Sequence, residues 1–150
     1  MRRVEISNDI LLSSVRRLIE EGHTATIRVK GVSMRPFLED GRDSVVLAAA
    51  DTLKKGDVVL AEIARGQYVL HRIIKMDGTA LTLMGDGNPK GTEKCRIVDV
   101  AGIAIALIRK GKTVECDSCK WRVYSKIWPA LRPLRRYLLF IYRRLFFYRR

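Results

Sequence analysis

The sequence predicts a mainly β protein: a coiled antiparallel sheet with one helix before it and a basic, aromatic helix after it. Three observations lead to this fold class. Short runs rich in Val, Ile and Leu alternate with turn residues from about residue 24 to residue 108. No helical pattern of about ten residues separates these runs, which argues against a parallel, doubly wound sheet. Arginines and aromatic residues are concentrated in residues 120–150.

A first helix is predicted over about residues 7–21. Ser7 suits its N-cap, Asp9 suits the positive end of the helix dipole, and Gly22 suits the position after the last turn. Four apolar residues fall on one face and predict that the helix packs against the rest of the domain: Leu11, Val15, Leu18 and Ile19.

The β region contains two predicted hairpins. The first turns at residues 65–67, Arg-Gly-Gln, and the second at Asp77-Gly78. Apolar runs flank both turns, so we expect the strands on either side to pair antiparallel.

The C-terminal region is predicted to be helical and interrupted. Residues 111–120 read as a polar connector, and residues 121–150 are helix-prone and rich in arginine. Pro129 and Pro133 are expected to break or kink this helix, which leaves a final helix from about Leu134.

The positive charge of the chain lies at this end. Its 150 residues, about one domain, carry a net charge of +13. Residues 120–150 contain ten Lys and Arg and no acidic residue, whereas residues 1–119 are nearly balanced. We therefore expect a β domain at 1–119 and a basic amphipathic tail at 120–150.

The cysteines predict neither a disulfide framework nor a metal site. There are three, Cys95, Cys116 and Cys119, and the first residues lack the apolar stretch of a secretory signal. A single Cys-x-x-Cys needs two more ligands to hold zinc, and Cys95 supplies at most one. We expect reduced thiols in a cytoplasmic protein that uses no metal and no cofactor.

Ser33 lies in a segment that raises the question of nucleophilic chemistry, "VKGVSMRPFLEDGRDSVVL". A serine hydroxyl needs a base to react near neutral pH. His23 follows the first helix and reads as a cap or surface residue. His71, in "YVLHRII", shares a strand face with Val69 and Ile73, so its ring needs a partner, structural or catalytic.

Four segments, in order, resemble the signal peptidase and SOS-repressor self-cleaving superfamily. Residues 31–43 resemble its G-x-S-M-x-P…G-x-D segment, and residues 55–59 its K-G-D-x-V strand start. His71-Arg72 occupies the place of the general base, and residues 85–88 resemble its G-D-x-N segment. In the bacterial signal peptidases and the repressors the general base is a lysine. In the endoplasmic reticulum and archaeal-type signal peptidases it is a histidine followed by arginine, as in this chain.

The resemblance implies a signal-peptidase-type fold and a catalytic set. Ser33 would be the nucleophile, His71 the general base, and Asp86 the acid that holds the imidazole. Asp86 also reads as an ordinary turn aspartate. The histidine branch has a second acid about six residues later; this chain has Thr92 there with Glu93 adjacent, so the role of Glu93 stays open.

The residues around Ser33 are expected to shape the oxyanion and substrate site. The family implies that the backbone N–H of Ser33 contributes to the oxyanion hole. Gly31 stands where some bacterial relatives have a serine donor, so it offers no side-chain hydrogen bond. Met34 and Pro36 are expected to form the loop and the wall of the substrate pocket.

Three functions are compatible with these residues. The first is a serine endopeptidase with a Ser33/His71 dyad, acting on an extended peptide or a precursor protein. The second is a catalytically silent module that binds an extended peptide. The third is a self-cleaving regulator, which the histidine base and the missing DNA-binding domain disfavour. The oligomeric state stays open.

The basic tail suggests contact with a membrane surface. Residues 134–150 alternate arginine pairs with Tyr, Phe and Leu, as in an interfacial helix on anionic lipid. Nucleic-acid binding is a less favoured alternative, and packing on the β domain or on a second copy is another. Signal peptidases carry a spanning anchor, and this chain has no apolar run long enough for one. We therefore expect an endopeptidase in the cytoplasm, at the inner face of the membrane.

Overall fold

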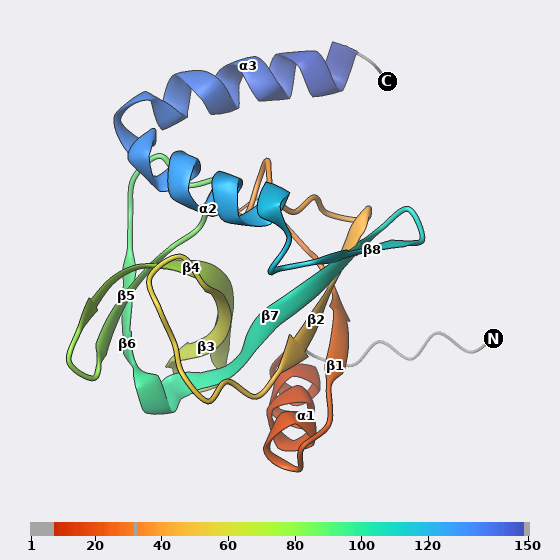
Figure 1. The fold of residues 1–150 in the computed structure, drawn as a ribbon, viewed down its shortest axis with the longest axis vertical. Helices are drawn as coiled ribbons and strands as arrows, with labels where there is room; N and C mark the ends of the chain where they lie inside the picture. Colours follow the sequence, from red (N-terminus) through yellow and green to blue (C-terminus); the bar gives the residue numbers. More distant parts are fainter. Residues whose placement is uncertain (1–7, 32, 149–150) are drawn as a thin grey trace.

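An eight-stranded antiparallel sheet organises the protein, as a computed structural model describes it over residues 8–31 and 33–148 (Figure 1). The strand order is β1-β2-β7-β3-β4-β5-β6, and β8 pairs with β7 outside this path. The strands are β1 (Ala25–Arg28), β2 (Asp43–Ala48), β3 (Val58–Ala64), β4 (Gln67–Asp77), β5 (Ala80–Met84), β6 (Glu93–Arg96), β7 (Val100–Arg109) and β8 (Lys112–Glu115). The predicted fold class is confirmed.

The first helix, α1 (Asn8–Glu20), agrees with the predicted range. Its expected cap, Ser7, lies outside the described residues, and so does the side chain of Asp9. Only part of the expected apolar face is buried: Val15 and Ile19 enter the core, whereas Leu11 and Leu18 are exposed. The buried face of α1 is therefore narrower than predicted, because the helix packs on one end of the sheet and the side of the helix that carries Leu11 and Leu18 faces solvent.

The two predicted hairpins are present. β3 and β4 are joined at Arg65 and Gly66, and β4 and β5 are joined at Gly78 and Thr79. This register places His71 opposite Val59 on one side of β4 and fixes the position of β5 on the other.

The core consists of two apolar clusters on the coiled sheet. One is built mainly from α1, β1, β2 and β7, and it includes Leu38 and Leu47. The other is built from β3 to β6 and includes Ile73 and Leu83. The candidate residues of β4 lie beside this second cluster.

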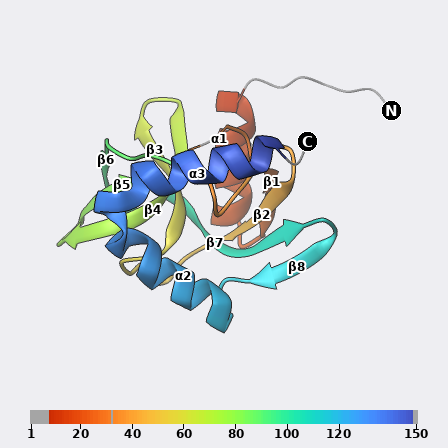
Figure 2. The ribbon, with the colours of Figure 1, turned by 90° about the horizontal axis from the view of Figure 1, so that it is seen from above.

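Two helices cover the opposite end of the molecule from α1 (Figures 1 and 2). They are α2 (Cys119–Ala130) and α3 (Arg135–Tyr148), joined by the 3-10 turn Arg132–Leu134. Pro129 lies in the last turn of α2 and Pro133 in the connecting turn, so the predicted interruption is confirmed. Trp121 and Trp128 of α2 are buried against the β domain. No helix among the described residues is long and apolar enough to span a membrane.

Candidate active site

Ser33 lies in the loop between β1 and β2, against the segment that follows β5. The carbonyl oxygen of Ser33 accepts a hydrogen bond from the N–H of Gly87 at 2.7 Å. The Sδ of Met34 accepts one from the N–H of Asp86 at 3.4 Å. These two contacts join the loop of the predicted nucleophile to the G-D-x-N segment. In the second contact, Met34 and Asp86 are 52 residues apart in the sequence.

His71 is buried on β4 and is held by Glu93. Its side chain is 6% exposed, and its Nδ1 lies 2.8 Å from Oε2 of Glu93, whose side chain is 26% exposed. An ionised carboxylate can only accept, so Nδ1 carries the proton of this hydrogen bond. The other ring nitrogen, Nε2, is then the basic one.

Gly85 shows where Nε2 points. A Cβ placed on Gly85 would lie 3.0 Å from Nε2 of His71 and would collide with the carbonyl oxygen of Ser33. The basic nitrogen and the backbone of Ser33 therefore face the same small space, which stays open because residue 85 has no side chain. The structure brings the two residues of the predicted dyad to one place.

The sheet register explains how Glu93 reaches His71. Leu83 of β5 pairs with Ile73 on one side and with Glu93 on the other. Ile73 and His71 are two residues apart on β4, so they share a face. The side chain of Glu93, on β6, thus lies on the same face of the sheet as His71, on β4. It reaches His71 diagonally past the end of β5, the strand between them.

Asp86, which we expected beside the imidazole of His71, instead binds Arg72. Its carboxylate forms a bidentate ion pair with Arg72, at 2.8 Å from Nε to Oδ1 and 2.8 Å from Nη2 to Oδ2. Both side chains are almost fully buried. Burial by itself would lower the pKa of Arg72. The charge of Asp86, its hydrogen bonds with Arg72 and the smaller contributions of Tyr124 and Cys116 together outweigh burial and raise that pKa.

Helix α2 completes the surroundings of Asp86. The hydroxyl of Tyr124 donates to Oδ2 at 3.1 Å, and Nε1 of Trp128 donates to the backbone oxygen of Asp86 at 2.9 Å. Burial and the neighbouring carboxylate raise the pKa of Tyr124, so its hydroxyl stays protonated and can donate. Arg72 also donates to Ser125 at 2.7 Å. Arg72 alternates with His71 along β4 and lies on the opposite face of the strand, where α2 covers it.

The other predicted site residues mostly shape the loop. The N–H of Gly31 donates to Oδ2 of Asp40 at 2.9 Å, which closes the start of the loop. Met34 is buried beneath Asp86. Pro36 follows a cis peptide bond and lines a cavity beside the loop.

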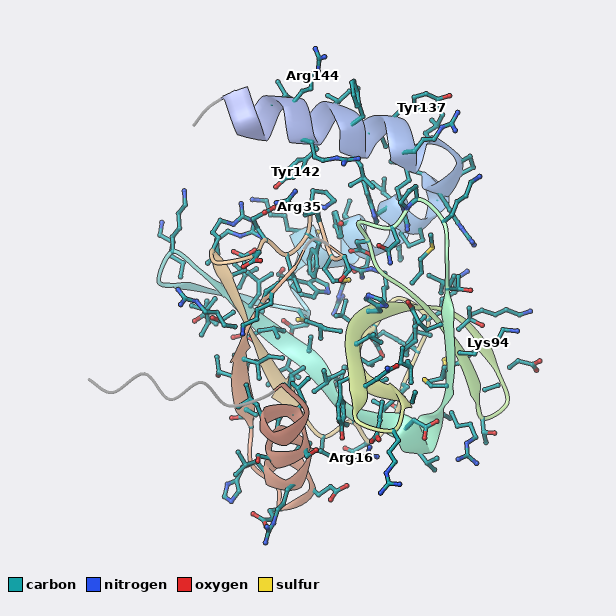
Figure 3. The ribbon with its side chains drawn as sticks, turned by 180° about the vertical axis from the view of Figure 1, so that it is seen from behind. Arg16, Arg35, Lys94, Tyr137, Tyr142 and Arg144 are labelled. Carbon is teal, nitrogen blue, oxygen red and sulfur yellow. The ribbon has the colours of Figure 1, made fainter. Side chains whose placement is uncertain are left out.

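Helix α3 contacts both the segment that follows β5 and the loop that carries Ser33. Nη1 of Arg135 donates to the carbonyl oxygens of Gly85 and Asn88, at 3.3 and 3.2 Å. Further along, the hydroxyl of Tyr142 donates to Oε2 of Glu39 at 3.1 Å, and Glu39 belongs to the Ser33 loop. Figure 3 shows Tyr142 pointing from α3 toward the β domain while Arg144 points away from it. Packing of the tail on the β domain was one of the alternatives left open by the sequence, but the loops that it contacts were not predicted.

The family model for Peptidase S24-like proteins matches residues 3–107, more than half of the chain. The chain belongs to this family. It is thus a member of a peptidase family in the signal peptidase and SOS-repressor superfamily, as the four motifs predicted. The matched range contains Ser33, His71, Asp86 and Glu93 but ends before β8, α2 and α3. A comparison with curated proteins finds no match.

Proposed function

We propose that this protein is a serine endopeptidase in which Ser33 is the nucleophile, His71 the general base and Glu93 the acid that orients the base. The observation that carries the proposal is the common space of Nε2 of His71 and the Ser33 backbone above Gly85. The hydrogen bond from Nδ1 to Glu93 leaves Nε2 free to take a proton.

The proposed reaction uses these groups in sequence. Oγ of Ser33 attacks the scissile carbonyl carbon while Nε2 of His71 accepts its proton. The imidazolium that forms is stabilised by Glu93 and returns the proton to the leaving amine. Water then enters, loses a proton to the same nitrogen and attacks the acyl carbon. The bond from that carbon to Oγ of Ser33 breaks, Nε2 returns the proton to Oγ, and the peptide acid leaves.

Asp86 has a positioning role in this proposal. Its ion pair with Arg72 fixes the residue next to the base, and its backbone N–H contacts Met34 next to the nucleophile. The pair His71-Arg72 also supports a place in the histidine-base branch of the superfamily. There, the arginine would serve to hold the acid of the G-D-x-N segment.

A peptide mixture tests the proposed activity without knowledge of the natural substrate. Wild type and Ser33→Ala are incubated with a digest of a denatured proteome, and new peptide termini are identified by mass spectrometry. We expect new termini with wild type and none above background with Ser33→Ala. The same termini with both proteins would overturn the proposal. Intact mass of the enzyme alone identifies self-cleavage, which would favour the regulator instead.

We further propose that the peptidase works at an anionic membrane surface, in the cytoplasm, through the outer face of α3. Tyr137, Phe140, Ile141 and Leu145 are 53–64% exposed there. Arg136, Arg143 and Arg144 are exposed beside them. Aliphatic and aromatic residues can enter the acyl boundary while the arginines bind anionic headgroups, whereas nucleic acid would leave the aliphatic residues in water.

Outer-face substitutions test this part better than removal of residues 134–150, because Arg135 and Tyr142 contact the site loops. We expect vesicles of phosphatidylglycerol and phosphatidylcholine to sediment wild type. The double variant Phe140→Ser, Ile141→Ser should lose most of this binding at an unchanged melting temperature. Equal sedimentation of both proteins would contradict the membrane proposal.

A further inference from the structure

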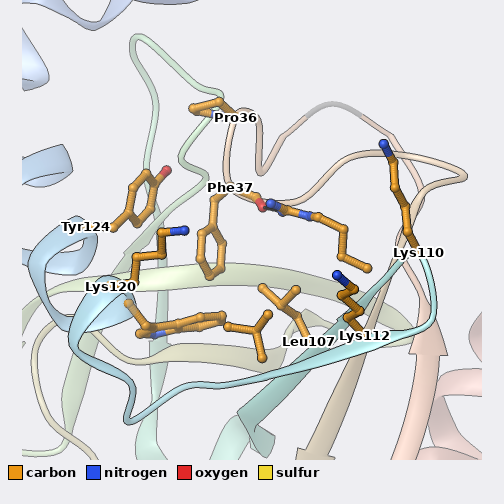
Figure 4. A pocket seen from close by; sticks show the side chains of 10 residues that line it. Pro36, Phe37, Leu107, Lys110, Lys112, Lys120 and Tyr124 are labelled. Atoms are coloured by element: carbon orange, nitrogen blue, oxygen red, sulfur yellow. Dashed lines mark hydrogen bonds between the residues drawn. The ribbon is translucent and has the colours of Figure 1, made fainter.

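A cavity of about 550 Å³ opens beside the Ser33 loop (Figure 4). Pro36, three residues after Ser33, forms part of its wall. Its volume lies in the range of small-ligand and side-chain pockets. Much of its lining comes from the β7–β8 hairpin and from α2, beyond the residues that the family model matches.

The base of the cavity is apolar and aromatic. Phe37 meets Trp121 edge to face, with ring centroids 4.1 Å apart, and stacks on Tyr124 at 4.9 Å. Leu107 and Val114 extend this surface along the hairpin. Rings held against one another in this way form a rigid apolar floor that suits a large apolar side chain.

The rim of the cavity is cationic. Lys110, Lys112, Lys120 and Arg109 line it, and none of the residues lining it is acidic. Arg109 forms an ion pair with Asp43. Within residues 8–31 and 33–148, no hydrogen bond or ion pair involves the side chains of the three lysines. Figure 4 shows Lys112 and Lys120 on either side of Phe37.

Two of these lysines stand where the local backbone does not favour them. Lys120 lies in the first turn of α2, a helix with no acidic residue in that turn, where the helix dipole repels a cation. Lys110 has a φ of 50° in the hairpin turn, a conformation that suits Asn or Gly better. Neither position is explained by local stability, and both place a positive charge at the cavity.

We propose that this cavity binds an acidic stretch of the peptide substrate, with a large apolar side chain on the floor and carboxylates at the lysines. This inference rests on the proposed endopeptidase function, because the cavity adjoins the loop of the proposed nucleophile. It gives that enzyme a substrate class: peptides that carry acidic residues next to a large apolar residue near the scissile bond.

Calorimetric titration of the Ser33→Ala protein tests the proposal without hydrolysis. The probes are acetyl-Gly-Phe-Glu-Glu-Gly-amide and its counterpart with two glutamines. We expect the acidic peptide to bind about tenfold more tightly than the neutral one, and its affinity to fall with added salt. Adding Lys112→Gln and Lys120→Gln should remove the preference, and Lys110→Asn should reduce it while suiting the turn.

A matched control carries Lys55→Gln and Lys94→Gln, two exposed lysines outside the cavity with the same total charge change. This control should keep the tenfold preference. Equal binding of the two peptides, binding of neither, or a preference that survives in the cavity variant would overturn the proposal. Peptide hydrolysis by wild type would still report on the proposed function, so the two failures are distinguishable. Vesicle sedimentation of the cavity variant should stay at the wild-type level, because α3 is unchanged.

Discussion

Oε2 of Glu93 lies 2.8 Å from Nδ1 of His71, although the two residues are 22 positions apart and on strands separated by β5. The contact assigns the basic lone pair to Nε2 and directs it to the Ser33 loop. Asp86, the acid that the motif suggested, instead forms a buried ion pair with Arg72. The two acids are therefore expected to differ in what their loss does.

Glu93→Gln should impair catalysis and leave the fold intact. The amide keeps a hydrogen bond but no longer stabilises the imidazolium, so kcat/KM should fall on the order of 10²-fold. The melting temperature should change little, because Glu93 is partly exposed. Peptide hydrolysis and thermal denaturation measure the two effects. The control is Lys94→Gln on the neighbouring exposed position; a comparable loss in that variant would contradict the role of Glu93.

Asp86→Asn should destabilise the protein. It leaves the buried guanidinium of Arg72 without its counter-charge, which costs about 3–5 kcal/mol of unfolding free energy. Urea denaturation measures this cost. Asp77→Asn, at the exposed end of β4, should cost less than about 0.5 kcal/mol. If Asp86→Asn unfolds at the wild-type urea concentration yet loses activity, Asp86 acts in the chemistry and not in positioning.

Gly85→Ala should separate Ser33 from His71. The new methyl group would collide with the Ser33 carbonyl oxygen, a backbone atom that moves only with its loop. We expect a loss of about 1–3 kcal/mol of stability and of most of the activity. Gly91→Ala is the control, since its φ of 96° strains a side chain but no atom lies within 4 Å of the added Cβ. That variant should lose some stability and keep its activity.

The cysteines should differ in reactivity. Burial raises the pKa of the Cys116 thiol to about 12, so the reactive thiolate is nearly absent at pH 8 and appears only as the pH approaches that value. Cys119 is exposed. Iodoacetamide at pH 8, followed by peptide mass mapping, should modify Cys119 well before Cys116. Faster modification of Cys116 would show that α2 does not cover it in solution.

The sequence predicted those parts of the site that depend on local pattern. Alternation along β4 placed His71 on the face of Ile73, and glycine turns located both hairpins. The partner of the imidazole depends on the register across three strands, because Glu93 is brought beside His71 through Leu83. Counting residues outward from the Asp77-Gly78 turn could have indicated this alignment, had the position of β6 been known.

The role of the C-terminal helices could not be predicted from the sequence. Alternation puts Arg72 on the face of β4 opposite to His71, but nothing in β4 indicates that α2 packs over that face and buries the guanidinium. The arginines of the tail read as one cationic surface, yet Arg135 is buried and donates to the Gly85–Asn88 segment. Which arginine enters the protein is decided by the angle between α2 and α3, a tertiary feature that periodicity does not contain.

Activation of Ser33 by His71 is tested most directly by the rate at which a fluorophosphonate modifies Ser33, with mass mapping of the modified peptide. If His71 activates Ser33, wild type should form a stoichiometric adduct on Ser33 and the Ser33→Ala variant none. Labelling should be at least about 10²-fold slower in His71→Ala, measured at a temperature at which that variant is still folded. An adduct on another residue, or equal labelling of all three proteins, would contradict this activation.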